Sequence, residues 1–191
     1  TMNQVNTSDE WLMRQVARGQ REHLETLVRR YASPLLTYIQ RMVGDRHRAE
    51  ELFQDAFLAV WEKRRTYRFP RPFRPWLFSI AINRCRQSFR QRSAEDPLPL
   101  QDVEAQLPAA DAPTPVQLAV ATERARLVAS AIAALPPQQR TVVVLRNWNG
   151  LSYTEIAGIV RCGEATVRSH MHHALAGMRR YLEPRMRSEE L

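Results

Sequence analysis

Residues 63–92 read KRRTYRFPRPFRPWLFSIAINRCRQSFRQR, and the rest of the chain is organised around this stretch. It contains ten basic side chains and no acidic one. Aromatic residues are interleaved with these charges: Tyr67, Phe69, Phe73, Trp76, Phe78 and Phe89. Proteins hold an unpaired strand of nucleic acid with cations that follow the phosphates and rings on which bases stack. Taken alone, the stretch fits a basic surface over an ordinary aromatic core better, and its neighbours shift that balance.

The residues before this stretch have the periodicity of helices. Ser33-Pro34 predicts an interruption or kink in an early helix, and Asp45 is a good N-cap for a long helix over 46–64. That helix has an apolar stripe, and its other face is acidic and polar, with Glu50, Glu51, Gln54 and Asp55. Since Phe69-Pro70-Arg71-Pro72 cannot be helical, we expect an extended loop there and a new helix from Phe73. Residues 7–92 are therefore predicted to form a first, all-helical domain.

Residues 93–115 differ in composition from what precedes them. Five of the chain's prolines fall in this segment, and residues 93–122 carry five acidic and no basic side chains. The flanking blocks are basic, with net charges of +9 before this acidic stretch and +4 after it. Such a composition cannot build a packed core, so we expect a flexible, acidic, Pro-rich linker.

Residues 116–184 are predicted to form a second small helical domain. Ser152-Tyr153-Thr154-Glu155 is a capping box that opens a short helix, and a brief turn at Arg161-Cys162-Gly163 leads to another helix from about Glu164. This is a helix-turn-helix pattern. Polar side chains gather early on its second helix, where base edges would be read: Arg168, Ser169, His170, His172 and His173. The fold class is therefore all-α, with two small helical domains joined by the linker.

The composition restricts the classes of function. A net charge of +8 and a pI near 10.4 favour a polyanionic partner. Two cysteines give no disulfide framework, and neither a membrane-spanning run nor a signal peptide is present, so we expect a reducing cytoplasm. We find no nucleophile–base constellation and no phosphate-cradling glycine loop, so neither an enzyme nor a cofactor is predicted.

Two ordered sets of motifs resemble the extracytoplasmic-function class of sigma factors. The first block resembles that family's promoter-melting domain through AEELFQDAF at 49–57 and FRPWLFSIAIN at 73–83. The second block resembles its −35-reading domain through LPPQQR at 135–140, LSYTEIA at 151–157 and ATVRS at 165–169. These motifs lie in the expected order with a linker of suitable size between them, and together they cover most of residues 20–182.

The resemblance implies roles for particular residues. The family's helix that docks on core RNA polymerase corresponds here to Glu51, Leu52, Gln54 and Asp55. The surface that captures and follows the unpaired −10 strand corresponds to Lys63, Arg64, Arg65, Tyr67, Arg68, Phe69, Asn83, Arg84, Arg86 and Arg90. The helix that reads the −35 duplex corresponds to Arg168, Ser169, His170 and His173, with Thr166 on a phosphate. The sequence departs from the family at Arg161, where Gly is frequent, at His170, where Arg is usual, and at Gln87, where Asp is usual.

The resemblance also implies three partners: core RNA polymerase, promoter DNA and an anti-sigma factor anchored in the membrane. One alternative is a helix-turn-helix regulator that binds duplex DNA but not polymerase. A second alternative is a metal site built from Cys162, His170, His172 and His173. Because His172 points away from the face shared by His170 and His173, and no carboxylates join them, we predict no metal.

Overall fold

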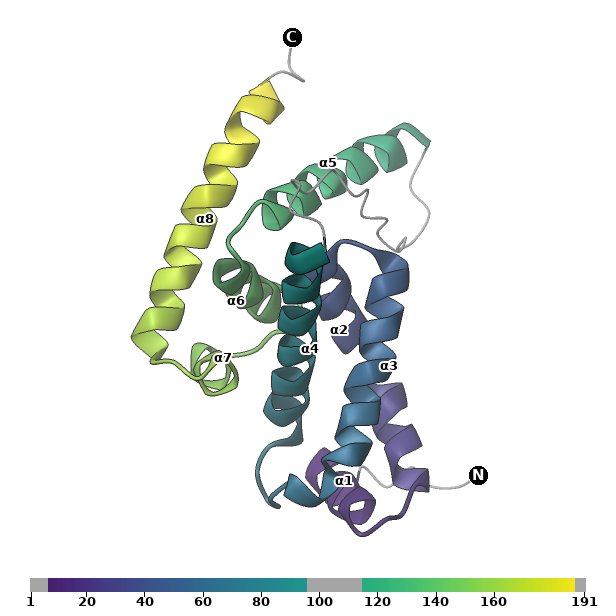
Figure 1. Cartoon of the computed structure of the whole chain (residues 1–191). Coiled ribbons are helices and arrows are strands. Elements are labelled where there is room, and N and C mark those ends of the chain that lie inside the picture. The colour runs from purple at the N-terminus through teal and green to yellow at the C-terminus, as the bar shows by residue number, and fades with distance from the viewer. Residues whose placement is uncertain (1–6, 96–114, 188–191) are drawn as a thin grey trace.

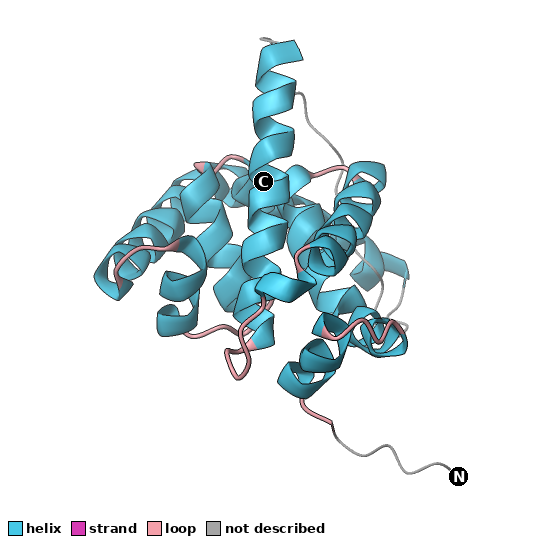
Figure 2. Cartoon of the chain, turned by 60° about the horizontal axis from the view of Figure 1, so that its bottom comes forward, coloured by secondary structure: helices cyan, strands magenta, loops and turns pink. Residues whose placement is uncertain are grey.

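The computed structural model describes residues 7–95 and 115–187, and within these ranges it consists of helices joined by loops, without a strand (Figures 1 and 2). The N-terminal group contains α1 (Asp9–Ala17), α2 (Glu22–Val43), α3 (Arg46–Glu62), the short 3-10 helix η1 (Arg64–Thr66) and α4 (Phe73–Glu95). The C-terminal group contains α5 (Pro115–Ala133), α6 (Pro137–Asn147), α7 (Tyr153–Val160) and α8 (Glu164–Arg187). The predicted all-α class is confirmed. Most of the expected linker, 96–114, lies outside the described residues.

Capping residues read from the sequence set the helix ends. The Asp45 side chain accepts a hydrogen bond from the Arg48 backbone N–H at 2.6 Å and opens α3. Ser152 and Glu155 form the reciprocal capping box of α7. Gly44 has a φ of 75°, a conformation that glycine adopts at little cost, and ends α2. These three boundaries follow from local chemistry alone.

Of the predicted interruption or kink at Ser33-Pro34, the interruption is wrong, because α2 continues through Pro34. A proline inside a helix costs about 3 kcal/mol, since it removes one hydrogen bond and crowds the preceding turn. Tyr31 and Leu35 flank Pro34 and are both buried, as is Tyr38 one turn further on. Burying each such side chain stabilises the fold by about 1.5–3 kcal/mol. Core packing along both halves of α2 therefore outweighs the local cost of the proline.

The core of the N-terminal group is formed where α2, α3 and α4 meet, and α4 runs beside α3 (Figure 1). The rings of Tyr38 and Phe78 pack edge to face with centroids 5.7 Å apart. Those of Tyr31 and Phe73 do the same at 5.4 Å. This aromatic layer fixes the start of α4 against α2, and so fixes the position of the loop that precedes α4.

The two helical groups pack against each other and share one continuous core. Helix α6 contacts α2, and α7 contacts α4. Arg140 in α6 is only 9% exposed and donates a 2.8 Å hydrogen bond to the carbonyl of Met42 near the end of α2. The same guanidinium donates to the carbonyls of Ala133 and Leu135 in its own group. One buried cation therefore joins three carbonyl oxygens from both groups.

A second polar contact lies at the other end of α6. Asn149 is 4% exposed, and its side-chain amide donates to the carbonyl of Pro34 at 2.8 Å. Its own carbonyl accepts a hydrogen bond from Arg74 of α4. The guanidinium of Arg41 lies 4.0 Å from the ring centroid of Trp148. Polar contacts with defined geometry therefore join the two groups at both ends of α6.

Within the described residues, no helix is long and apolar enough to cross a membrane.

Replacing Arg140 with Met should lower the free energy of unfolding by about 2–3 kcal/mol, because three buried carbonyl groups lose a charged donor. Urea denaturation followed by circular dichroism measures this change. Arg126→Met, at an exposed position on α5, is the matched control and should change stability by no more than about 0.5 kcal/mol. Equal stabilities for the two variants would show that the Arg140 contacts do not hold the groups together.

Candidate nucleic-acid interface

The polar ridge of α3 is exposed at Glu51 and Gln54, and Asp55 is half-buried beside them. Glu51 pairs with Arg48 at 2.8 Å. The side chain of Leu52 is 2% exposed and packs into the core, so it supports the ridge from beneath and presents no surface. Leu58, which is 59% exposed, continues the same face one turn further on. Sequence reasoning did not single out Leu58, although its spacing of i+3 and i+4 from the ridge residues was visible.

Tyr67, which was expected to contact DNA, lies beneath the loop between α3 and α4 and is only 7% exposed. Its hydroxyl donates to the carbonyl of Arg71, and its ring packs 5.3 Å from that of Trp76. Burial, followed by the nearby charges of Glu10 and Asp9, raises the pKa of Tyr67 to about 12. Tyr67 therefore shapes the loop from inside.

Phe69 is the ring that this loop exposes, at 47% of its surface. The guanidinium of Arg14, from α1, lies 4.9 Å from its ring centroid. Lys63, Arg65 and Arg68, in the same segment of the chain, are also exposed. An exposed ring bordered by cations is the arrangement that binds an unpaired base and its phosphates. Sequence reasoning placed Phe69 correctly in this loop but missed Arg14, because nothing in the sequence indicates that α1 lies against it.

Arg64, also expected on this surface, is already engaged by its own helix end. It donates to the carbonyl of Trp61 at 2.7 Å, and its guanidinium lies 4.1 Å from that ring. Arg21 approaches the same ring at 5.4 Å. Trp61 and Arg64 are half-buried and Arg21 is exposed, so one ring lies between two cations at the start of the loop.

Helix α4 extends the basic surface along its outer side. Asn83, Arg86 and Arg90 are exposed and Arg84 is half-buried, whereas Cys85 packs inward at 1% exposure. Burial raises the pKa of the Cys85 thiol to about 12, so this cysteine stays protonated in the core. The face of α4 predicted from the sequence is the face that the fold leaves open.

The helix-turn-helix is formed by α7 and α8, with Val167 and Met171 buried beneath it. Thr166, Arg168, Ser169 and His173 are exposed and His170 is half-buried. Arg168 pairs with Glu164 at 2.6 Å, and Glu164 also accepts from Thr154 at 2.8 Å. The hydrogen bonds from Thr154 and Arg168 lower the pKa of Glu164. These contacts orient Arg168 at the start of α8.

The turn between α7 and α8 explains one departure noted in the sequence. Arg161 ends α7 with φ 59° and ψ 49°, in the left-handed region. This conformation costs a residue with a side chain roughly 1–2 kcal/mol, and glycine adopts it freely. The turn therefore keeps the geometry that glycine would give, and adds a cationic side chain.

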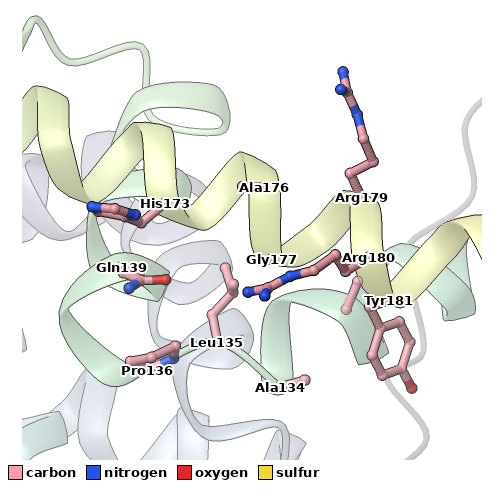
Figure 3. A pocket seen from close by; sticks show the side chains of 11 residues that line it. Ala134, Leu135, Pro136, Gln139, His173, Ala176, Gly177, Arg179, Arg180 and Tyr181 are labelled. Atoms are coloured by element: carbon pink, nitrogen blue, oxygen red, sulfur yellow. The ribbon is translucent and has the colours of Figure 1, made fainter.

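The structure brings together residues that the sequence assigned to separate surfaces. Arg86 of α4 and Thr166 and His170 of α8 line one cavity of about 200 Å³. A second hollow, of about 640 Å³, lies between α8 and the junction of α5 and α6 (Figure 3). Leu135 and Gly177 line it closely, with His173 at one end and the Arg179 side chain pointing away. Neither hollow could be predicted from the sequence, because both depend on tertiary packing.

No group of three or more metal-ligating side chains occurs within the described parts of the chain. His172 and His173 are neighbours, with ring centroids 5.7 Å apart. Cys162 and His170 line the same cavity, together with Arg86 of α4. That the chain binds no metal stays a prediction.

The sequence matches two family models. Residues 27–95 match sigma-70 region 2, and residues 125–178 match sigma-70 region 4. The RNA polymerase sigma-H factor of Pseudomonas aeruginosa is 30% identical over 185 residues, covering 94% of this chain and 96% of its own length. The ECF RNA polymerase sigma-E factor of Escherichia coli K12 is 28% identical over 188 residues, covering 94% and 97%.

Two solved structures have the same fold. CnrH, in complex with the cytosolic domain of CnrY, superposes with a TM-score of 0.71 at 25% identity, covering 93% of this chain and 99% of CnrH. RpoE of Bartonella quintana, in complex with the anti-sigma factor NepR, gives a TM-score of 0.69 at 21% identity, covering 83% and 96%. The second likeness concerns the fold alone.

Tyr67→Phe should reduce the loss of stability at alkaline pH. The pKa of Tyr67 is raised in the folded state, so its contribution is fully present below about pH 10 and is lost as pH rises towards 12. At pH 8 the variant should be about 1 kcal/mol less stable, since the hydrogen bond to Arg71 is gone. Thermal unfolding between pH 8 and pH 11.5 measures both effects. Parallel curves for the variant and the wild type would contradict the buried position of the phenol.

Proposed function

The chain belongs to the extracytoplasmic-function class of the sigma-70 family, and we propose how its residues carry out that family's task. As a sigma factor it is a transcription initiation factor, not an enzyme: it binds core RNA polymerase and directs it to promoters. The observation that supports the residue assignments best is the continuity of α3 with the Phe69 loop. A polymerase surface that holds the ridge of α3 also positions the loop at the end of the same helix.

We assign polymerase docking to the ridge of α3. Glu51, Gln54 and Asp55 give it an acidic-polar surface in a half of the chain that is otherwise basic, and Leu52 anchors the helix beneath them. Complementary charge guides encounter and fixes register between partners. The exposed Leu58 adds apolar area at the end of the ridge. A basic surface on core polymerase with an apolar depression beside it would fit this face.

We assign capture of the unpaired −10 strand to the Phe69 loop and the outer side of α4. Unstacking a base costs a few kcal/mol, and stacking on an aromatic ring returns about 1–3 kcal/mol per base. Phe69 offers the exposed ring, and Arg14 already occupies the position next to it. Lys63, Arg65 and Arg68 would bind phosphates around the loop. The strand would then follow Asn83, Arg84, Arg86 and Arg90.

We assign reading of the −35 duplex to the start of α8. Thr166 lies in the first turn, where backbone N–H groups and the helix dipole favour a phosphate. Arg168, Ser169 and His173 face outward, and a helix of this kind reads base edges in the major groove. His170 is half-buried and lines a cavity together with Arg86 of the N-terminal group, so we expect it to become more accessible when the groups separate.

The packed arrangement must open for both elements to be bound at once. The −35 and −10 elements lie about 25 base pairs apart, which is roughly 85 Å of B-form duplex. A compact chain of 191 residues is only about 40 Å across. The segment of about 20 residues between the groups can reach roughly 70 Å when extended. The chain is therefore long enough to reach both elements only after α6 and α7 leave α2 and α4.

An anti-sigma factor is the third partner. We propose that it favours the packed arrangement by occupying surfaces that polymerase would otherwise hold, that it is anchored in the membrane, and that the sigma factor works in the cytoplasm. Among the solved relatives, CnrH is bound to the cytosolic domain of CnrY and RpoE to the anti-sigma factor NepR. The alternative is a regulator that binds duplex DNA but not polymerase, and it would give the acidic-polar ridge of α3 no binding partner.

Transcription in vitro tests the proposed function directly. Core polymerase supplemented with the purified chain should make transcripts whose start sites share two upstream elements, identified by sequencing. The free chain should bind the same promoters poorly, since its packed arrangement is too short to reach both elements at once. Random start sites, or tight and specific binding of promoter DNA by the free chain, would refute the proposal.

Asp55→Arg should weaken binding to core polymerase by about 10-fold or more, because it places a like charge against the basic partner surface. Biolayer interferometry with immobilised polymerase measures the affinity. Glu22→Arg reverses an exposed acid at the start of α2, away from the ridge, and should bind as the wild type does. Unchanged affinity of the Asp55 variant would exclude the ridge as the docking surface.

Phe69→Ala should slow formation of the open complex by about 10-fold or more, since stacking on one ring is lost while polymerase docking is kept. Permanganate footprinting of unpaired thymines reports the opening. Trp11→Ala removes another exposed ring, which contacts His23 instead of the loop, and should melt promoters normally. If both variants open DNA at the wild-type rate, Phe69 does not trap a base.

A further inference from the structure

The cavity between the two helical groups is lined by cationic and neutral hydrogen-bonding groups together with the apolar side chains of Val142 and Val160. Arg86 comes from α4, Gln138 from α6, Arg161 and Cys162 from the turn after α7, and Thr166 and His170 from α8. No carboxylate is among the described residues that line it. Its volume is about 200 Å³. Two arginines, one from each helical group, therefore line the same small cavity.

Neither arginine is neutralised by the protein. In the described part of the chain, Arg86 and Arg161 have no ion-pair partner, whereas Arg29, Arg30, Arg46, Arg48 and Arg168 each have one. Both side chains are exposed, so an anion can reach them from the solvent. Arg161 is also held in a left-handed conformation that glycine would adopt without strain. Strain of this kind concentrates at binding and switch sites.

The donors fit one class of ligand. Guanidinium groups bind phosphate-type oxyanions through paired N–H groups, and a threonine hydroxyl and a glutamine amide can donate to the remaining oxygens. Pockets for drug-sized molecules enclose about 300–1,000 Å³. A cavity of about 200 Å³ suits a single phosphate group better than a whole nucleotide. The ligand chemistry is therefore that of a small tetrahedral oxyanion.

We propose that this cavity binds a phosphate-class oxyanion, held by Arg86 from one helical group and Arg161 from the other. The bound anion would contact both halves of the chain and so stabilise their packed arrangement. Arg86, Thr166 and His170 cannot bind the anion and promoter DNA together, so the anion competes with promoter binding. This competition rests on the proposed function, whereas anion binding by the free chain does not.

Thermal unfolding of the full chain tests the proposal. In sodium phosphate at about 100 times the dissociation constant, the wild-type melting temperature should rise by about 5 °C or more above that in sodium chloride of equal ionic strength. Phosphate also stabilises proteins by exclusion from their surface, so the decisive quantity is the difference between variants. Arg161→Gly removes the guanidinium and suits the left-handed turn, so it should fold and lose the excess shift. Arg126→Gln, on the exposed side of α5, should keep it.

A second variant tests whether the two halves share the site. Arg86→Gln should also abolish the excess shift, and the double variant should lose no more than either single one. Additive losses would refute a common site, as would an excess shift in Arg161→Gly equal to that of the wild type.

The source of the phosphate group is tested with ATP in place of inorganic phosphate. A shift that requires ATP and disappears in Arg161→Gly places the phosphate of a larger molecule in the same site. A lack of any Arg161-dependent shift with either ligand refutes the proposal. Promoter-specific transcription in vitro is measured separately, so its failure would refute the proposed function and leave the anion site untouched.

Discussion

The structure depends on a buried guanidinium that joins the two helical groups. Arg140 reaches across from α6 to the carbonyl of Met42 at the end of α2, while its other amino group holds carbonyls of its own group. Burial lowers the pKa of Arg140, yet arginine remains charged at any physiological pH. Because the buried guanidinium stays charged, it needs the carbonyl oxygens that accept its hydrogen bonds. This requirement, together with Asn149 at the other end of α6, makes the packed arrangement specific instead of a loose hydrophobic contact.

Local chemistry made much of the fold predictable from the sequence. Asp45, Gly44 and the Ser152–Glu155 pair mark helix ends through hydrogen bonds within a few residues, so no knowledge of the tertiary structure is needed. Pro34 shows where local reasoning fails, because the free energy that keeps α2 continuous comes from burial against distant helices. The contacts of Arg140 and Asn149 span more than 90 residues of sequence. Neither contact can be predicted from the sequence alone.

The candidate site divides in the same way. The sequence indicated which segments carry charge and aromatic rings, and Asn83, assigned to the −10 surface by resemblance, is exposed on α4. It could not separate Tyr67, which is buried, from Phe69, which is exposed, because the loop between helices has no period. Arg14 escaped notice for a related reason: its role depends on α1 packing beside the loop. The helix-turn-helix was recognisable, but the cavity that His170 shares with Arg86 was not.

We propose a sigma factor whose two helical groups pack against each other until core polymerase separates them. Two dyes, at Arg29 on α2 and Arg179 on α8, would report this separation by energy transfer between single molecules. Both side chains are exposed, and neither belongs to a proposed contact surface. Efficient transfer in the free chain, falling to low transfer when core polymerase is added, is the expected result. Unchanged transfer in complexes that initiate transcription would contradict the account, because the packed chain would then be the active form.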